Sequence, residues 1–338
     1  MTWIAAFETV GRKCDKKRTQ KKAMLVPLTF LGKHSAIILA AGVAVAFFLP
    51  ELDVYLMPAF PYLVSALLGV AFLRVDVRAV LAQIRRPKLL LSVLVAMFLI
   101  SPIVMLGIIT VTRPPPEIAL ALMMFACAPP LASTTNIAQM IGLDSAICLN
   151  TTVIGAIMLP FTAPPILILA SEFDIELDAL AIFLKLLYIV GGAFVVGGLL
   201  RYLLGPIRIQ RFGVAFDGIT TLLLLAFLMA VMGPGGKLLL EKPLMALWLC
   251  SIALVANFLS NFIFAMVSEF LISGRFQKPG KLPASIGLIG GSRNFALMVP
   301  VLPPEIFAGV VVFLAFYQVP IYLTPLLERW IFKELRPT

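Results

Sequence analysis

Long apolar runs dominate this chain of 338 residues and restrict its possible folds more than any other feature. Most of these runs reach the roughly 20 residues that cross the hydrocarbon core of a bilayer as a helix. The composition agrees, with 61% hydrophobic residues, 13% charged residues and a mean hydropathy of +1.04, far from the values of a soluble domain. We therefore predict an all-α integral membrane protein with ten transmembrane helices. The predicted spans are Ser35–Leu49, Tyr55–Leu73, Leu89–Val111, Ile118–Ile141, Asp144–Ala170, Ala179–Leu204, Phe212–Met232, Pro243–Ile272, Ala284–Val301 and Ile306–Ile331.

The distribution of Lys and Arg predicts the orientation of these spans. With residues 1–34 as a basic cytoplasmic tail, 22 of the 27 Lys and Arg residues fall on the inside, counting Arg201 and Arg329 at the inner ends of their spans. Three fall outside, and Lys185 and Arg293 lie within spans. Cytoplasmic loops carry such an excess of basic residues. We therefore place both termini in the cytoplasm, with a C-terminal tail at residues 333–338, and expect a multi-pass protein of the plasma (inner) membrane. The basic run Arg12–Arg18 abuts a membrane helix, which favours contact with anionic lipid over a role in nucleic acid binding.

Two of the apolar segments are interrupted in the middle, five spans apart. The first interruption reads CAPPLASTTNIA (Cys127–Ala138) and the second reads GLIGGSRNFAL (Gly287–Leu297). Consecutive prolines, Pro129 and Pro130, unwind the first helix because proline lacks an amide hydrogen and clashes with the preceding turn. Backbone freed at membrane depth persists only along a cavity or inside protein. Because five is odd, we predict two inverted five-helix repeats with broken helices 4 and 9, the arrangement that surrounds the binding site in many secondary transporters.

Small polar residues surround both breaks and form the candidate binding site. Hydroxyl and carboxamide groups supply oxygen ligands for a small cation or for a hydroxylated substrate, and the alternative is that they join helices by hydrogen bonds. The candidate substrate- or ion-binding residues are Ser133, Thr134, Thr135, Asn136, Asn150, Thr151, Thr152, Gly290, Gly291, Ser292, Arg293 and Asn294. No cofactor and no firm metal site is predicted. The residues that could hold sodium are Ser133, Thr134, Thr135, Asn136 and Thr152.

The second break contains Arg293, near the middle of its span and without an acidic residue in the same span. An embedded arginine costs several kcal/mol, so it normally faces a cavity or a partner. We expect its guanidinium to face a water-accessible hollow between the two breaks. The guanidinium could bind an anionic substrate through paired donors, or it could permanently replace a cation that a related protein binds. It could also cap the carbonyl ends of the broken helices. Lys185 lies about two turns from the end of its span, where a lysine can extend to the membrane surface.

The sequence lacks the residues that proton relays, phosphate-binding loops and enzyme active sites require. The acidic residues Asp144, Asp217 and Glu269 lie close to the predicted cytoplasmic ends of the spans, and the single histidine, His34, lies at the inner edge. A relay of embedded carboxylates or histidines is therefore unavailable for proton coupling. The segment Gly233–Lys237 lacks the spacing of a phosphate-binding loop, and we expect it to form an external turn. No constellation for an enzyme is present.

The residues between Cys127 and Thr152 resemble the bile acid:sodium symporter superfamily, with their CysAlaPro, SerThrThrAsn and AsnThrThr segments in order. The GlyGlySerArgAsn segment at 290–294 occupies the place of that family's Glu-x-Gly-x-Gln-Asn element. The resemblance identifies the chain as a bacterial-type member. It implies one transporter unit at residues 35–332, with a core of helices 3–5 and 8–10 and a moving panel of helices 1, 2, 6 and 7. In that core the broken helices 4 and 9 are crossed at their breaks. The family's substrates are organic anions.

Three positions depart from the family's sodium ligands. Aligning the second break places Ile289 where the family has a glutamate and Arg293 where it has a glutamine, and Met97 replaces a glutamine in helix 3. A fixed cation would repel sodium by several kcal/mol in a partly dry site. We therefore expect a secondary active transporter that moves a small organic anion by alternating access without sodium at this site. The alternatives are an organic anion exporter resembling the auxin exporters and a membrane sensor that has kept the fold without transport.

Overall fold

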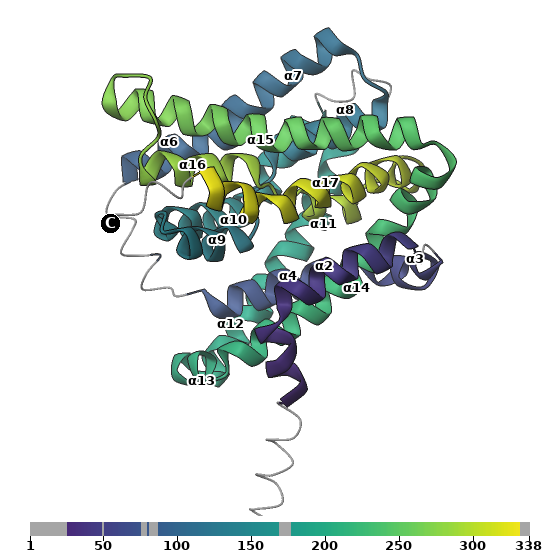
Figure 1. The fold of residues 1–338 in the computed structure, drawn as a ribbon, viewed down its shortest axis with the longest axis vertical. Helices are drawn as coiled ribbons and strands as arrows, with labels where there is room; N and C mark the ends of the chain where they lie inside the picture. The colour runs from purple at the N-terminus through teal and green to yellow at the C-terminus, as the bar shows by residue number, and fades with distance from the viewer. Residues whose placement is uncertain (1–25, 49–50, 76–79, 81–86, 169–176, 332–338) are drawn as a thin grey trace, which may run out of the picture.

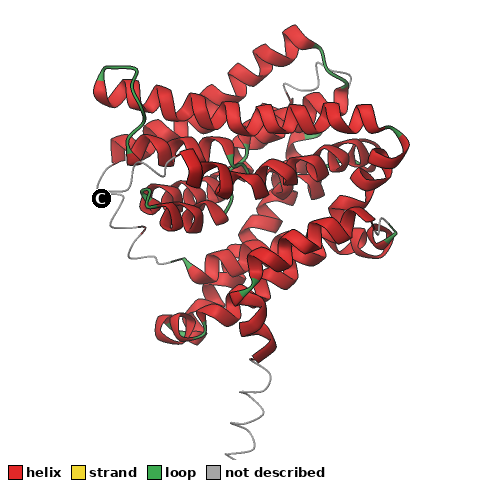
Figure 2. Cartoon of the chain, in the orientation of Figure 1, coloured by secondary structure: helices red, strands yellow, loops and turns green. Residues whose placement is uncertain are grey.

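The computed structural model describes residues 26–48, 51–75, 80, 87–168 and 177–331. Within these ranges all regular secondary structure is helical (Figure 2). Seven helices in these ranges are long and apolar enough to cross a membrane, and Val26–Lys33 together with Ile37–Val43 would make an eighth. The chain is thus a helical membrane protein, while the number of ten spans stays a prediction. The run Arg12–Arg18 and the tail at residues 333–338 lie outside the described residues.

The first half of the chain contains α2 to α10, and its longest uninterrupted helix is α10. A π-helical turn at Ala96–Ile100 joins α6 to α7 directly before Pro102, and a 3₁₀ turn at Met57–Ala59 joins α3 to α4. The helices are α2 (Ser35–Phe48), α3 (Leu52–Leu56), α4 (Phe60–Arg74), α6 (Pro87–Val95), α7 (Ser101–Thr112), α8 (Pro116–Cys127), α9 (Ser133–Ile141) and α10 (Ser145–Ile168).

The second half contains α11 to α17. A second π-helical turn, Leu187–Gly191, joins α11 to α12, and two 3₁₀ turns, Phe295–Leu297 and Val299–Val301, precede α17. The helices are α11 (Ala179–Leu186), α12 (Gly192–Leu204), α13 (Pro206–Arg211), α14 (Gly213–Glu241), α15 (Pro243–Ser273), α16 (Lys281–Gly291) and α17 (Pro304–Ile331).

These helices pack in two groups. In the lower part of Figure 1, α14 packs against α2, α3 and α4, and α12 packs against α4. In the upper part, α15 packs against α16 and α17, α17 packs against α8, and α10 packs against α8, α9 and α16. The groups meet where α14 contacts α17 and α15 and where α11 contacts α10. Both breaks predicted from the sequence lie in the upper group.

Large apolar side chains cover much of the outer surface. Val111, Tyr188 and Leu244 are more than 80% exposed, and they lie on three different helices or helix ends. A soluble protein seldom exposes large contiguous apolar patches, whereas lipid tails solvate such side chains without cost. The exposed side chains therefore agree with a membrane environment.

The predicted turn at Gly233–Lys237 is wrong, because α14 continues as a helix to Glu241. Its glycines are sites of close helix contact. A Cβ atom on Gly233 would lie 2.5 Å from Cβ of Asp53, and one on Gly235 would lie 2.8 Å from Cβ of Ala315. Lys237 Nζ then forms an ion pair with Asp53 at 3.1 Å. The glycines are needed because neighbouring helices approach the α14 backbone, a requirement that local sequence cannot distinguish from a turn.

Lys185 on α11 is exposed, and its predicted extension to the membrane surface stays a prediction. Its Nζ atom lies 3.5 Å from the carbonyl oxygen of Val301, to which it donates a hydrogen bond. The lysine on α11 thus contacts the turn that precedes α17.

Candidate functional site: the crossing of two broken helices

The first break separates α8 from α9. The helix α8 ends at Cys127, and Ala128 takes an extended conformation with φ −74° and ψ 148°. Pro129 and Pro130 follow, and neither can donate the amide hydrogen that would continue the helix. The helix resumes at Ser133. The double proline therefore leaves the last carbonyl groups of α8 without their usual helical partners.

The second break follows α16. The helix ends at Gly291, the next residues Ser292 and Asn294 have non-helical backbone angles, and only two short 3₁₀ turns follow before α17. A Cβ atom on Gly291 would lie 2.4 Å from the carbonyl oxygen of Asn257 on α15. Glycine is required here because α15 passes too close to the α16 backbone for any side chain.

The two breaks lie side by side and pair through their backbones. The amide of Leu131 donates to the carbonyl of Ser292 at 2.9 Å, and the amide of Asn294 donates to the carbonyl of Pro129 at 2.7 Å. Pro130 and Arg293 form an isolated antiparallel bridge between these bonds. Each break thereby satisfies backbone groups that the other has freed, as buried backbone requires. The structure brings together the two segments that the sequence places far apart.

The guanidinium of Arg293 lies inside this crossing. Its Nε atom donates to the carbonyl of Gly290 at 2.8 Å, and its Nη1 atom donates to the carbonyls of Ala128 at 3.0 Å and Ala126 at 3.4 Å. Nη2 contacts Oγ of Ser101 at 3.5 Å, and the ring of Phe264 lies 5.3 Å from the guanidinium carbon. One cation therefore caps carbonyl groups at the ends of both α8 and α16.

The surroundings of Arg293 correct the expected water-accessible hollow. The residue is only 1% exposed, and neither of the ion pairs among the described residues involves it. The carboxyl-terminal end of a helix carries partial negative charge, and two such ends point at the guanidinium. The charge is compensated by carbonyl dipoles in place of water or a carboxylate. The donors that an anion would need are largely engaged by the protein itself.

A polar network on α15 and α17 fixes the second break from behind. Asn257 Nδ2 donates to the carbonyl of Gly291 at 3.0 Å, and the hydroxyl of Tyr317 donates to the same carbonyl at 2.9 Å. The amide of Arg293 donates to the Tyr317 hydroxyl at 2.9 Å, and Thr324 Oγ1 donates to Asn257 Oδ1 at 3.3 Å. Our sequence reasoning did not find these residues. The available signal was Asn257 and Asn261, one helical turn apart within an apolar span.

The four polar residues that begin α9 point in different directions. Thr134 is buried, and its hydroxyl donates to the carbonyl of Leu131 at 2.7 Å, whereas Thr135 is half-buried. Ser133 and Asn136 are exposed, and Asn294 at the other break is partly exposed. The two breaks therefore carry exposed or partly exposed polar side chains, whereas Arg293 is buried.

The polar residues of α10 behave differently. Within the part of the chain that the structure describes, buried oxygen or nitrogen atoms of Asn150, Thr151, Thr152 and Ser292 lack a hydrogen-bond partner. Such atoms normally bind an ordered water or an ion, because an unpartnered buried polar atom costs about 1–3 kcal/mol. The hydroxyl groups of α10 are therefore not engaged in hydrogen bonds between the described helices, which was the alternative interpretation of this cluster.

The side chains present fit a sodium ion poorly at the second break. Ile289 and Met97, which stand where the resemblance places a glutamate and a glutamine, are both 0% exposed and apolar. Arg293, the third of these positions, brings a positive charge. The first break offers neutral oxygens, among them the Thr134 hydroxyl, which donates its hydrogen to the carbonyl of Leu131 and keeps its lone pairs.

Comparison with known protein families identifies the chain. The model of the sodium bile acid symporter family matches residues 60–242, which is more than half of the chain. A search of curated proteins gave no match. The match begins at α4, ends after α14, and includes the first break and both polar clusters of α9 and α10. The chain therefore belongs to the sodium bile acid symporter family and is a multi-pass membrane transporter.

Proposed function

We propose that the protein is a secondary carrier that moves a small organic anion across the plasma (inner) membrane by alternating access. Residues 35–332 form one transporter unit of ten spans in two inverted five-helix repeats, with both termini in the cytoplasm. Its partners are the anion and the bilayer, with no role for nucleic acid.

The paired breaks support the inverted repeat. Each predicted half contains one helix that is interrupted beside small polar residues, and the two interruptions bond to each other in antiparallel sense. The packing supports a division into two bodies, since α2, α3, α4, α12 and α14 form one group and the broken helices lie in the other. We assign the first group, with α11, to the moving panel and the second to the core.

The observation that carries the proposal is the set of partners around Arg293. Carbonyl oxygens of Gly290 and Ala128 at 2.8 and 3.0 Å are the type of ligand that a coupling cation would use. A guanidinium is positively charged at all physiological pH values. We therefore assign Arg293 as a permanent, covalently attached substitute for a coupling cation. Two of the roles predicted for Arg293, replacing a coupling cation and capping the ends of the broken helices, use the same contacts with carbonyl oxygens.

Transport then needs no sodium at this position. The positive charge is present in every state of the carrier, so binding of the anion is not linked to binding of an ion there. The anion's own gradient, or exchange for a second anion, supplies the driving force. Sodium binding at Ser133, Thr134, Thr135, Asn136 and Thr152 is not needed for this scheme.

The anion binds on the accessible face of the crossing. Ser133 and Asn136 are exposed and lie on one side of α9, three residues apart, and Asn294 lies at the adjacent break. Their hydroxyl and amide groups donate to a carboxylate or sulfonate. Arg293 acts through its electrostatic field, which is weakly screened in a site of low dielectric constant, and leaves the direct hydrogen bonds to these neutral donors.

Uptake into proteoliposomes tests this function. The purified chain is reconstituted with potassium or sodium as the only monovalent cation, and labelled carboxylates and sulfonates are presented with and without unlabelled anion inside. We expect counterflow of at least one anion at the same rate in both salts. The exposed-loop variant Arg275→Gln is the control for Arg293→Gln, which should lose most uptake. A strict need for sodium would refute the substitution of the cation, and binding without counterflow would identify a sensor.

A further inference from the structure

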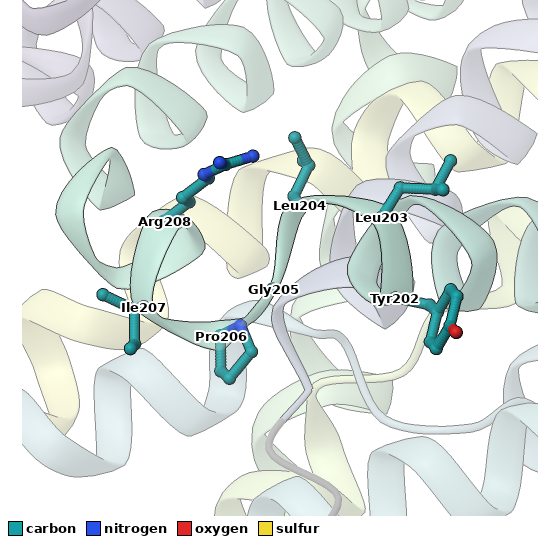
Figure 3. A pocket seen from close by; sticks show the side chains of 7 residues that line it. All are labelled: Tyr202, Leu203, Leu204, Gly205, Pro206, Ile207 and Arg208. Carbon is teal, nitrogen blue, oxygen red and sulfur yellow. The ribbon is translucent and has the colours of Figure 1, made fainter.

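A hollow lies where the chain turns from α12 into α13. The helix α12 ends at Leu204, and Gly205 turns the chain with a φ of +74° that side chains rarely adopt. Figure 3 shows the residues that line the hollow on either side of this turn, and its volume is about 430 Å³. The lining residues are Tyr202, Leu203, Leu204, Gly205, Pro206, Ile207 and Arg208.

The apolar part of this lining is exposed, as are many apolar side chains on the outer surface. Tyr202 is 85% exposed, Ile207 is 80% exposed and Leu203 is 63% exposed. Exposed Leu and Ile side chains match the acyl chains of lipid, and tyrosine is enriched at the boundary between the hydrocarbon core and water. With the predicted span ending at Leu204, the hollow lies at the predicted boundary of the hydrocarbon core, where an acyl chain meets its headgroup.

The polar part of the lining is cationic. Arg208 is exposed and extends towards Leu204 in Figure 3. Arg211 is also exposed and lies three residues further along α13, so the two residues lie on one side of the helix. Among the described residues neither takes part in an ion pair or donates a side-chain hydrogen bond. The guanidinium carbon of Arg211 lies 5.9 Å from the centre of the Phe212 ring.

Three charged residues of the described helices beside the corner are already engaged. Arg201 donates to the carbonyl of Leu73 at 3.0 Å, which attaches the end of α12 to α4. Asp217, the acidic residue at the start of α14, forms an ion pair with Arg74. Ile209 is buried and holds α13 in place. The corner is thus fixed, and Arg208 and Arg211 remain as two cations beside an apolar surface.

We propose that this corner is a binding site for an anionic phospholipid of the cytoplasmic leaflet. The phosphate lies between Arg208 and Arg211, which can each present two donors to its oxygens, and an acyl chain lies along Leu203 and Ile207. The apolar side chains favour a lipid over a free phosphate ion. The proposal rests on the predicted orientation and is independent of the transported anion.

Lipid retention by the purified full-length chain tests the site. The protein in detergent is titrated with phosphatidylglycerol or with phosphatidylcholine of the same acyl chains, and bound lipids are counted by native mass spectrometry. We expect phosphatidylglycerol to be retained selectively. Loss of one arginine should weaken retention about fivefold and loss of both about 25-fold, from the usual contribution of one basic residue near an anionic surface. The variants are Arg208→Gln, Arg211→Gln and the double substitution.

Control variants distinguish a specific lipid site from non-specific attraction between anionic lipids and exposed basic residues. Arg275→Gln removes an exposed arginine from another segment on the same predicted side and should leave retention unchanged. All variants must keep the wild-type melting temperature, since the two arginines have no structural hydrogen bonds. Equal retention of both lipids, or an unchanged double variant, would overturn the proposal. Displacement by inorganic phosphate or by an acidic peptide at the same concentration would assign the site to a free ion or to a protein and would also overturn it.

Discussion

Replacing Arg293 with methionine should destabilise the protein more than any conservative change elsewhere in the crossing. Methionine keeps the length and apolar stem of the side chain but removes all its donors. The carbonyls of Gly290 and Ala128, which now accept bonds at 2.8 and 3.0 Å, would be left without this partner in a dry environment. The crossing would keep its two backbone bonds, so we expect a folded but weakened protein.

The magnitude follows from these two short contacts. A hydrogen bond to a charged group contributes about 1.5–3 kcal/mol, so the pair contributes about 3–6 kcal/mol. Part of this is offset, because the variant no longer buries a charge. We expect a net loss of about 3 kcal/mol, or a decrease of roughly 6–12 °C in melting temperature. Arg293→Lys, which keeps the charge but offers one donor atom in place of three nitrogens, should lose about half as much.

The decrease in melting temperature is measured in detergent with a fluorogenic thiol reagent, which reports the exposure of buried cysteines during heating. Cys127 and Cys148 are both 0% exposed and react only when the helices separate. Arg275→Met, an exposed position, is the matched control and should shift the melting temperature by less than 1 °C. A shift below 2 °C for Arg293→Met would show that the carbonyl contacts do not hold the crossing together.

Three further changes test other parts of the reasoning. Tyr317→Phe removes the hydroxyl that accepts from the Arg293 amide and should cost about 1–3 kcal/mol in thermal unfolding, because a buried amide loses its partner. Gly235→Ala forces α14 away from Ala315 and should cost about 1–3 kcal/mol, whereas Gly198→Ala, with open space around it, should be neutral or slightly stabilising. The double variant Ile289→Glu and Arg293→Gln restores two of the three ligands implied by the family and should be stabilised by sodium, by about 2.7 kcal/mol at 100 times its Kd. Wild-type protein should show no sodium-dependent shift.

The sequence was sufficient to predict the class of the protein and the position of both breaks. The length of an apolar run, the distribution of charges and a pair of prolines are local properties. They can therefore be interpreted without knowledge of the tertiary structure. The breaks appear at 128–132 and 292–294, within the segments predicted for them. The same local reasoning failed at Gly233–Lys237. Glycine and proline usually indicate a turn, but here the glycines allow neighbouring helices to pack close to the backbone of α14.

The partners of Arg293 could not be predicted in the same way. An embedded arginine requires compensation of its charge, but its sequence neighbours do not reveal whether water, an anion, a carboxylate or carbonyl groups provide it. Three of its acceptors lie on α7 and α8 or directly after α8, more than 160 residues away. For the same reason Tyr317 and Asn257 were missed, since their contacts with the break depend on how α15 and α17 pack.

The sequence by itself determined that the chain enters the membrane as helices, which of these helices break, and that one break contains a permanent positive charge. Only the tertiary structure decided that the two breaks bond to each other and that the charge is held by the carbonyl ends of two helices. The physical reason is the distance along the chain over which each effect acts. Hydropathy and proline sterics act over a few residues, whereas hydrogen bonds form between whichever groups the packing of distant helices brings within about 3 Å.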